Sequence, residues 1–125
     1  MARSAAAAAA YGYDGVKLDS CSQFDNISGW ESLLNATGRQ MLLENCHNGG
    51  PPGTATCDGL GTPSDCPFHF YRTSADIRPS WTSIYSNLQT TVSYSTNVPP
   101  LSRPGSWAYP DMLEVGMMAT YEKSR

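Results

Sequence analysis

Four short apolar segments, each ending at a polar residue, alternate along this chain with stretches of helical periodicity. We predict strands over these segments, Gly15–Asp19, Gln40–Asn45, His69–Thr73 and Asp111–Val115. Their polar ends follow one another at intervals of 26, 28 and 38 residues, at Asp19, Asn45, Thr73 and Asp111. Strands that alternate with helices in this way form a parallel sheet with helices packed against it.

The stretches between these segments predict two helices. The first carries apolar residues at helical spacing and ends before Gly38; these residues are Ile27, Trp30, Leu33 and Leu34. The second runs from about Pro79 to Ser93 and carries a longer stripe of Ile77, Trp81, Ile84, Tyr85, Leu88 and Val92. Asp76 lies near the N-cap position of this second helix.

The intervals between strand ends are close to the roughly 30 residues per unit of a (β/α)8 barrel. We therefore expect an α/β fold, a partial (β/α)8 TIM barrel of about half the eight units. Catalytic side chains of such barrels lie at the carboxyl ends of the strands. One rim would then carry Asp19, Asn45, Arg72, Asp76 and Asp111.

Asp19 and Asp76 follow two strands that have one strand between them. Their carboxylates can therefore come within the roughly 5–6 Å that retaining glycosidases use. Composition alone favours a plainer alternative, in which Asp76 caps the following helix and Asp19 is a loop residue. The spacing of Asp19 and Asp76 along the sequence does not decide between a catalytic pair and these structural roles.

Composition limits the chain to one domain and excludes several classes of partner. The 125 residues divide into an alanine-rich N-terminal segment, 1–10, and a partial barrel, 11–125. Basic residues are scattered singly and the formal net charge is −3, so we expect no nucleic-acid partner and no binding to an anionic membrane surface. The longest apolar run, Ala5–Ala10, is far shorter than the roughly 20 residues that span a bilayer. The sequence leaves the oligomeric state open.

The cysteines favour disulfides over a metal site. Cys21, Cys46, Cys57 and Cys66 are separated by 25, 11 and 9 residues, and none makes the C-x2-C pair of a structural zinc site. Two sequons, Asn26-Ile27-Ser28 and Asn35-Ala36-Thr37, fit the secretory route. We expect a secreted protein or one of the vacuole or lysosome, although residues 1–10 lack the leucine-rich core of a signal peptide.

Several motifs together resemble one enzyme family. In chain order they are Val16-Lys-Leu-Asp-Ser-Cys21, Leu34-Asn-Ala-Thr-Gly-Arg39, Leu43-Glu-Asn-Cys46, Tyr71-Arg-Thr-Ser-Ala-Asp-Ile77 and Pro104-Gly-Ser-Trp-Ala-Tyr-Pro-Asp-Met-Leu-Glu-Val-Gly116. Their order and register resemble the fourth to seventh barrel strands of the α-galactosidases (melibiases), glycoside hydrolase family 27. The resemblance implies a retaining O-glycosyl hydrolase, without cofactor or metal, that removes terminal α-D-galactosyl residues from oligosaccharides, glycoconjugates or polysaccharides.

The resemblance also implies roles for single residues. Asp19 would be the nucleophile and Asp76 the general acid/base, while Lys17 and Arg72 would bind sugar hydroxyls. Further substrate contacts would come from Cys46, His47, Trp107 and Asp111. For Trp107 and Tyr109, packing against other residues is an equal alternative to stacking on the sugar. Asp111 has the alternative role of holding its loop in place. The alternative for His47 is that of an exposed loop residue. A Cys21–Cys46 disulfide is implied too.

The chain departs from the family pattern in three places. The three strands that precede Lys17 in the family are absent, so we expect an inactive fragment, or a non-catalytic carbohydrate-binding remnant. Residues 46–50 replace the acidic and aromatic pair that commonly follows the cysteine, which leaves β-L-arabinopyranosides or α-N-acetylgalactosaminides as alternative substrates. Residues 51–67 resemble an insertion, in which Cys57 and Cys66 would close a loop of their own.

Overall fold

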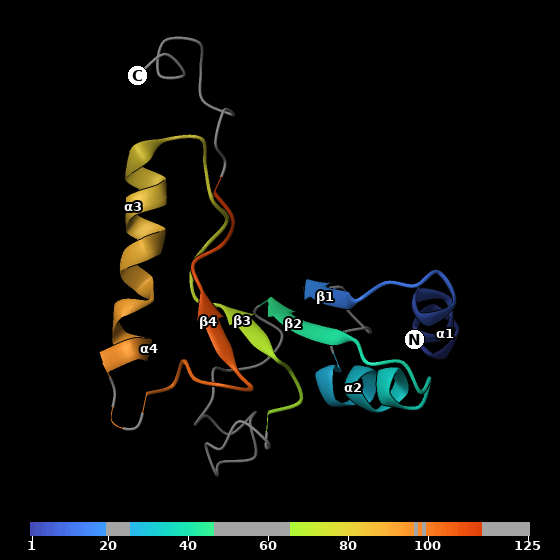
Figure 1. Ribbon diagram of the computed structural model, residues 1–125. Helices are drawn as coiled ribbons and strands as arrows, with labels where there is room; N and C mark the ends of the chain where they lie inside the picture. Colours follow the sequence, from blue (N-terminus) through green and yellow to red (C-terminus); the bar gives the residue numbers. More distant parts are fainter. Residues whose placement is uncertain (20–25, 47–65, 97, 99, 114–125) are drawn as a thin grey trace.

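The described residues of the chain form one four-stranded parallel sheet flanked by helices. The computed structural model describes residues 1–19, 26–46, 66–96, 98 and 100–113. The strands, in their order across the sheet, are β1 (Gly15–Asp19), β2 (Leu42–Cys46), β3 (Phe70–Arg72) and β4 (Trp107–Tyr109) (Figure 1). Chain order and sheet order are therefore the same, as in consecutive units of a βα barrel. The expected α/β class with a parallel sheet is confirmed.

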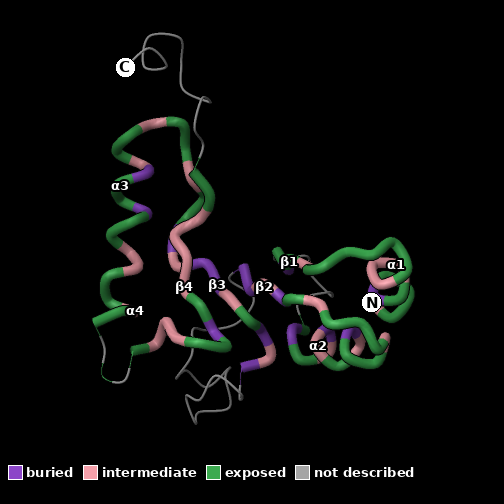
Figure 2. The backbone as a smooth tube through the Cα atoms, in the orientation of Figure 1, coloured by how far each residue is buried: buried purple, intermediate pink, exposed green. Residues whose placement is uncertain are grey.

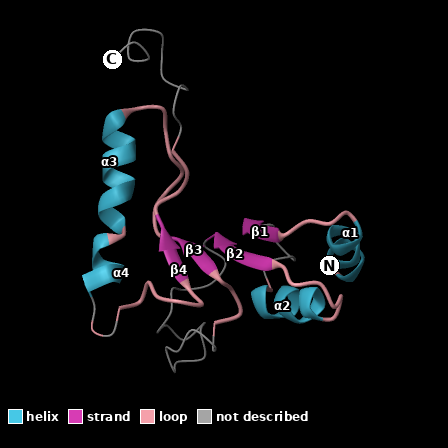
Figure 3. Ribbon diagram, in the orientation of Figure 1, coloured by secondary structure: helices cyan, strands magenta, loops and turns pink. Residues whose placement is uncertain are grey.

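In the part of the chain that the structure describes, four helices accompany the sheet. They are α1 (Ala2–Ala10), α2 (Ile27–Asn35), α3 (Trp81–Thr90) and α4 (Val92–Thr96) (Figure 3). Figure 1 shows α1 and α2 at the β1 end of the sheet and α3 and α4 at the β4 end. Within the described residues, no helix is both long and apolar enough to cross a membrane.

The first three predicted strands are confirmed to within two residues at each end, and the fourth is wrong. Residues 111–113 form no strand, and β4 lies earlier, at Trp107–Tyr109. Two residues stop the strand: Pro110 has no N–H for the ladder, and Asp111 takes a left-handed backbone with φ of 78°. The apolar pair Met112 and Leu113, which suggested a strand, is exposed.

Helix α2 follows the prediction closely. The Asn26 side-chain oxygen accepts a hydrogen bond from the Gly29 amide at 2.8 Å, which caps the first turn. Ile27, Trp30 and Leu34 are buried at helical spacing. After the helix the chain reverses at Gly38, whose φ of 74° is the left-handed conformation that glycine adopts without strain.

The second predicted helix differs from the structure in two respects. It is divided into α3 and α4 at Thr91, and its cap is Ser80, whose hydroxyl accepts from the Ser83 amide at 3.3 Å. Asp76 therefore does not cap the helix. Much of the expected apolar stripe is exposed, namely Trp81, Tyr85, Leu88 and Val92. The buried residues of α3 are Ile84 and Asn87.

The core lies between one face of the sheet and α2. It is formed by Ala5, Leu18, Ile27, Trp30, Leu34, Leu43, Cys66, Phe68 and Tyr71 (Figure 2). Because neighbouring residues of a strand point to opposite faces, this core fixes which side chains remain on the other face. The alanine-rich segment takes part, since it forms α1, which packs on α2 and buries Ala5.

Two neighbouring leucines of β2 provide a test of this packing. Leu43 is 1% exposed and Leu42 is 50% exposed. We expect Leu43→Ala to lower the free energy of unfolding by about 2–5 kcal/mol, because it removes buried methyl groups and leaves a cavity. Leu42→Ala should change it by about 0.5 kcal/mol or less. Urea unfolding followed by circular dichroism measures both, and equal effects would contradict the assignment of the two faces.

Candidate active site

The face of the sheet opposite the core carries two rows of functional side chains. The first row runs across the four strands through paired residues, Lys17, Glu44, Phe70 and Trp107. The second row lies two residues further along each strand, toward its carboxyl end, and consists of Asp19, Cys46, Arg72 and Tyr109. Strand alternation thus brings five predicted site residues onto one face. Asn45, expected on the same rim, instead aligns with Leu18 and is buried on the core side.

Lys17 lies between two carboxylates. Its ammonium nitrogen is 3.8 Å from Asp19 Oδ2 and 3.7 Å from Glu44 Oε1. The Asp19 side chain is 60% exposed and the Glu44 side chain 13% exposed. The cation is therefore shared between an accessible carboxylate and a largely buried one.

Glu44 is a site residue that the sequence analysis missed. Its Oε1 accepts a hydrogen bond from the Tyr109 hydroxyl, and the Tyr109 ring lies 5.8 Å from that of Phe70. Burial raises the pKa of Glu44 above its ordinary value, against the opposing effect of Lys17. The alternation of side chains along a strand was the signal that could have indicated Glu44. Glu44 lies two residues before Cys46, so both side chains lie on the same face of the sheet, where Glu44 is opposite Lys17.

Arg72 is the second shared cation. Its side chain is 6% exposed, with Nη2 2.7 Å from Asp76 Oδ1 and Nη1 3.4 Å from Asp111 Oδ2. The Asp76 side chain is 88% exposed, whereas that of Asp111 is 6% exposed. Arg72 thus repeats the arrangement of Lys17, with one accessible and one buried carboxylate.

Asp111 joins the loop after β4 to the loop after β3. Its carboxylate accepts hydrogen bonds from the amides of Ile77 at 3.0 Å and Met112 at 2.9 Å. Burial alone would raise the pKa of Asp111, but these amides and Arg72 outweigh it and hold the pKa below its ordinary value. Ser74 adds a second tie between the loops, because its hydroxyl donates to the Pro110 carbonyl at 2.8 Å. The loop-holding role weighed for Asp111 is therefore present in the structure.

Cys46 is a free, buried thiol and not half of a disulfide with Cys21. The register places it opposite Asp19, and the thiol hydrogen-bonds to that carboxylate. Burial raises its pKa, which keeps the thiol protonated as a donor. Cys66 is disulfide-bonded. Cys21, His47 and Cys57 lie outside the described residues.

The arrangement can support acid/base and nucleophilic chemistry by carboxylates. Asp19 ends β1 and Asp76 follows β3, so β2 lies between the strands that carry them. Each has a basic neighbour and an exposed carboxylate that a substrate can reach. Among the described residues, no group of three or more His, Cys, Asp or Glu side chains is arranged to hold a metal ion.

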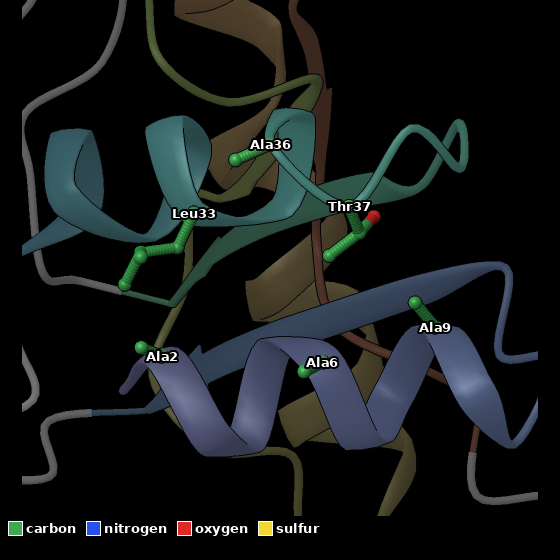
Figure 4. Close-up of a pocket in the computed structure, with 6 residues that line it drawn as sticks. All are labelled: Ala2, Ala6, Ala9, Leu33, Ala36 and Thr37. Carbon is green, nitrogen blue, oxygen red and sulfur yellow. The ribbon is translucent and has the colours of Figure 1, made fainter.

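A pocket of about 360 Å³ lies elsewhere, between α1 and α2. Its lining is Ala2, Ala6, Ala9, Leu33, Ala36 and Thr37 (Figure 4). None of these side chains is ionisable, so the pocket offers no acid or base. The strand ends therefore remain the better candidate for chemistry.

Comparison with known proteins gives one family. The family model described as Alpha galactosidase A matches residues 1–124. Alpha-N-acetylgalactosaminidase of Rattus norvegicus is 33% identical over 97% of this chain and 30% of its own length, and that of Gallus gallus is 32% identical over 94% and 30%. Alpha-galactosidase 3 of Arabidopsis thaliana is 28% identical over 94% of this chain and 26% of its own length. The chain thus spans about a third of the length of these relatives.

The lowered pKa of Asp111 predicts a pH dependence of stability. A carboxyl group with a depressed folded-state pKa contributes stability above its unfolded pKa, here near 3.8, and loses it as the pH falls through the folded value. We expect Asp111→Asn to lower the free energy of unfolding by about 1–3 kcal/mol at pH 7, with a difference from the unsubstituted protein that shrinks toward pH 2. Denaturant titrations between pH 2 and 7 measure this.

The matched control for this prediction is Asp14→Asn. Asp14 also pairs with an arginine, Arg39 at 2.6 Å, but its side chain is 92% exposed. Exposed pairs contribute little, so the control should lose about 0.5 kcal/mol or less. A pH-independent difference for Asp111→Asn would show that Asp111 acts through shape and not through charge.

Proposed function

The chain belongs to the Alpha galactosidase A family, and on that premise we propose that it carries the active site of a retaining glycoside hydrolase acting on terminal α-D-galactosyl residues. One observation carries the proposal. Two exposed carboxylates, Asp19 and Asp76, follow strands on either side of β2, and each contacts a basic side chain of the same sheet face. Retaining glycosidases use two such carboxylates, one as nucleophile and one as acid/base.

In the first half of the reaction, the Asp19 carboxylate attacks the anomeric carbon of the galactosyl residue. The bond from that carbon to the leaving oxygen breaks, and Asp76 gives its proton to this oxygen. The product is a glycosyl ester on Asp19 and a free alcohol. In the second half Asp76 takes a proton from water, whose oxygen attacks the same carbon and releases Asp19.

The two basic residues support different steps. Lys17 stabilises the negative charge that Asp19 needs as a nucleophile. Arg72 pairs with Asp76 at 2.7 Å. In the proposed cycle, hydroxyl groups of the sugar take over the contact with Arg72, and Asp76 is then free to carry the proton that the leaving oxygen receives. Asp111 continues to balance the charge of Arg72.

A second candidate substrate is a terminal α-N-acetylgalactosaminide. The observation in its favour is that two of the relatives above are named alpha-N-acetylgalactosaminidase. The two sugars differ at carbon 2, so a comparison of kcat/KM on nitrophenyl α-galactoside and on nitrophenyl α-N-acetylgalactosaminide decides between them. A β-L-arabinopyranoside completes the panel.

The roles of the two carboxylates predict different kinetic signatures. In the full-length protein that contains this sequence, we expect Asp19→Asn to lower kcat on the order of 10⁴-fold for every leaving group, because the nucleophile is lost. Asp76→Asn should lower it by about 10²–10⁴-fold on alkyl galactosides and much less on dinitrophenyl galactosides, whose leaving oxygen needs no proton. Steady-state assays on both substrate types measure this.

Asp14→Asn is the control, since Asp14 lies just before β1 and pairs with Arg39. It should retain the activity of the unsubstituted protein. Full activity in Asp19→Asn, or an Asp76→Asn loss that is independent of the leaving group, would contradict the assigned roles. Sugar binding without any turnover in the unsubstituted protein would favour a carbohydrate-binding remnant.

A further inference from the structure

The neighbours of Lys17 form a continuous series of contacts across all four strands. Phe70 of β3 contacts the Tyr109 ring of β4, and the Tyr109 hydroxyl donates to Glu44 of β2. The same carboxylate oxygen, Oε1, lies 3.7 Å from the Lys17 ammonium of β1, which in turn faces Asp19. The series therefore ends at the carboxylate proposed as the nucleophile.

We propose that Glu44, held by Tyr109, is a positioning residue that fixes the Lys17 ammonium beside Asp19. The role rests on the proposed function, because it concerns the nucleophile of that reaction. Glu44 has no part in bond breaking or proton transfer. It acts on the reaction only through Lys17.

The flexibility of lysine is the physical reason for such a role. A lysine side chain carries four rotatable carbon bonds and about 2 kcal/mol of rotamer entropy, so a single contact at 3.8 Å holds it poorly. Glu44 is largely buried and hydrogen-bonded, so its own rotamer is fixed by packing. A fixed carboxylate on the second side of Lys17 restricts the ammonium to positions near Asp19.

The charges around Lys17 are arranged like those around Arg72. Lys17 lies between an exposed carboxylate, Asp19, and a largely buried one, Glu44. Arg72 provides a precedent within the same sheet: the buried Asp111 holds it while the exposed Asp76 remains accessible. Glu44 takes the place of Asp111 in the Lys17 half of the site.

The first test measures the reactivity of Lys17 without any substrate. The chain has two lysines, Lys17 and Lys123, and the second serves as an internal reference. Acetic anhydride is applied at trace level, and mass spectrometry of peptides gives the acetylation ratio of Lys17 to Lys123. We expect Glu44→Gln, which keeps the shape of the side chain, to raise this ratio about threefold, because it removes the charge that holds the Lys17 side chain at 3.7 Å and so makes the amine more accessible to the reagent.

Two further variants make this test specific. Tyr109→Phe keeps both the ring and the Glu44 carboxylate but loses the hydroxyl, so it should raise the ratio by a smaller factor. Asp14→Asn removes a carboxylate that pairs with Arg39 and not with Lys17, and it should leave the ratio unchanged. An unchanged ratio in Glu44→Gln overturns the proposal whatever the kinetics show.

The second test uses kinetics of the full-length protein that contains this sequence. We expect Glu44→Gln to lower kcat about tenfold with KM changed by about twofold or less, since placement of the cation affects the reaction step. In a Lys17→Met background the same substitution should add about twofold or less, because its effect passes through Lys17. If the losses in activation free energy from the two substitutions were additive, Glu44 would act by a route other than Lys17, and the proposal would be overturned. No turnover in the unsubstituted protein would instead overturn the proposed function.

Discussion

The register between β1 and β2 is the constraint on which the site depends. It places Lys17 opposite Glu44 and Asp19 opposite Cys46, and so brings together residues that are about 27 positions apart in the chain. A slip of one residue would move every side chain of a strand to the other face. Leu18 and Leu43 oppose such a slip, because it would move their buried side chains out of the core. The apolar core thus fixes the position of the charged groups.

Two carboxylates of the site, Glu44 and Asp111, are largely buried and stay so because each has compensating partners. An unpaired buried charge is strongly destabilising, so each must have compensating partners. Glu44 has Lys17 and the Tyr109 hydroxyl, and Asp111 has Arg72 and two backbone amides. The pKa shifts of the two groups differ in sign. Burial dominates at Glu44 and raises its pKa, whereas at Asp111 the two amides and Arg72 together outweigh burial and lower the pKa.

The sequence predicted what depends on local pattern and missed what depends on contacts between strands. Short apolar segments that end at polar residues predicted the first three strands. The motifs singled out Lys17, Asp19, Arg72 and Asp76, which form two ion pairs in the structure. The fourth strand was misplaced because Met112 and Leu113 resemble a strand, while the backbone at Pro110 and Asp111 ends one. Strand alternation could place Glu44 on the face of Cys46, but its hydrogen bond with Tyr109, 65 residues away in the chain, could not be predicted from local pattern. The partner of Cys46 could not be predicted for the same reason. The Cys46 thiol hydrogen-bonds to Asp19 on the neighbouring strand and does not form a disulfide with Cys21.

The two halves of the site have the same arrangement, in which a basic side chain lies between a buried carboxylate and an exposed carboxylate. In one half the order is Glu44, Lys17, Asp19, and in the other it is Asp111, Arg72, Asp76. The buried member is fixed by contacts to another strand or loop. In the proposed reaction the cation would therefore keep its place while the exposed carboxylate changes its bonding or protonation. A reaction in which one carboxylate becomes an ester and the other exchanges a proton requires cations that stay in place through both changes. The paired arrangement therefore fits a two-step displacement better than a single exposed ion pair would.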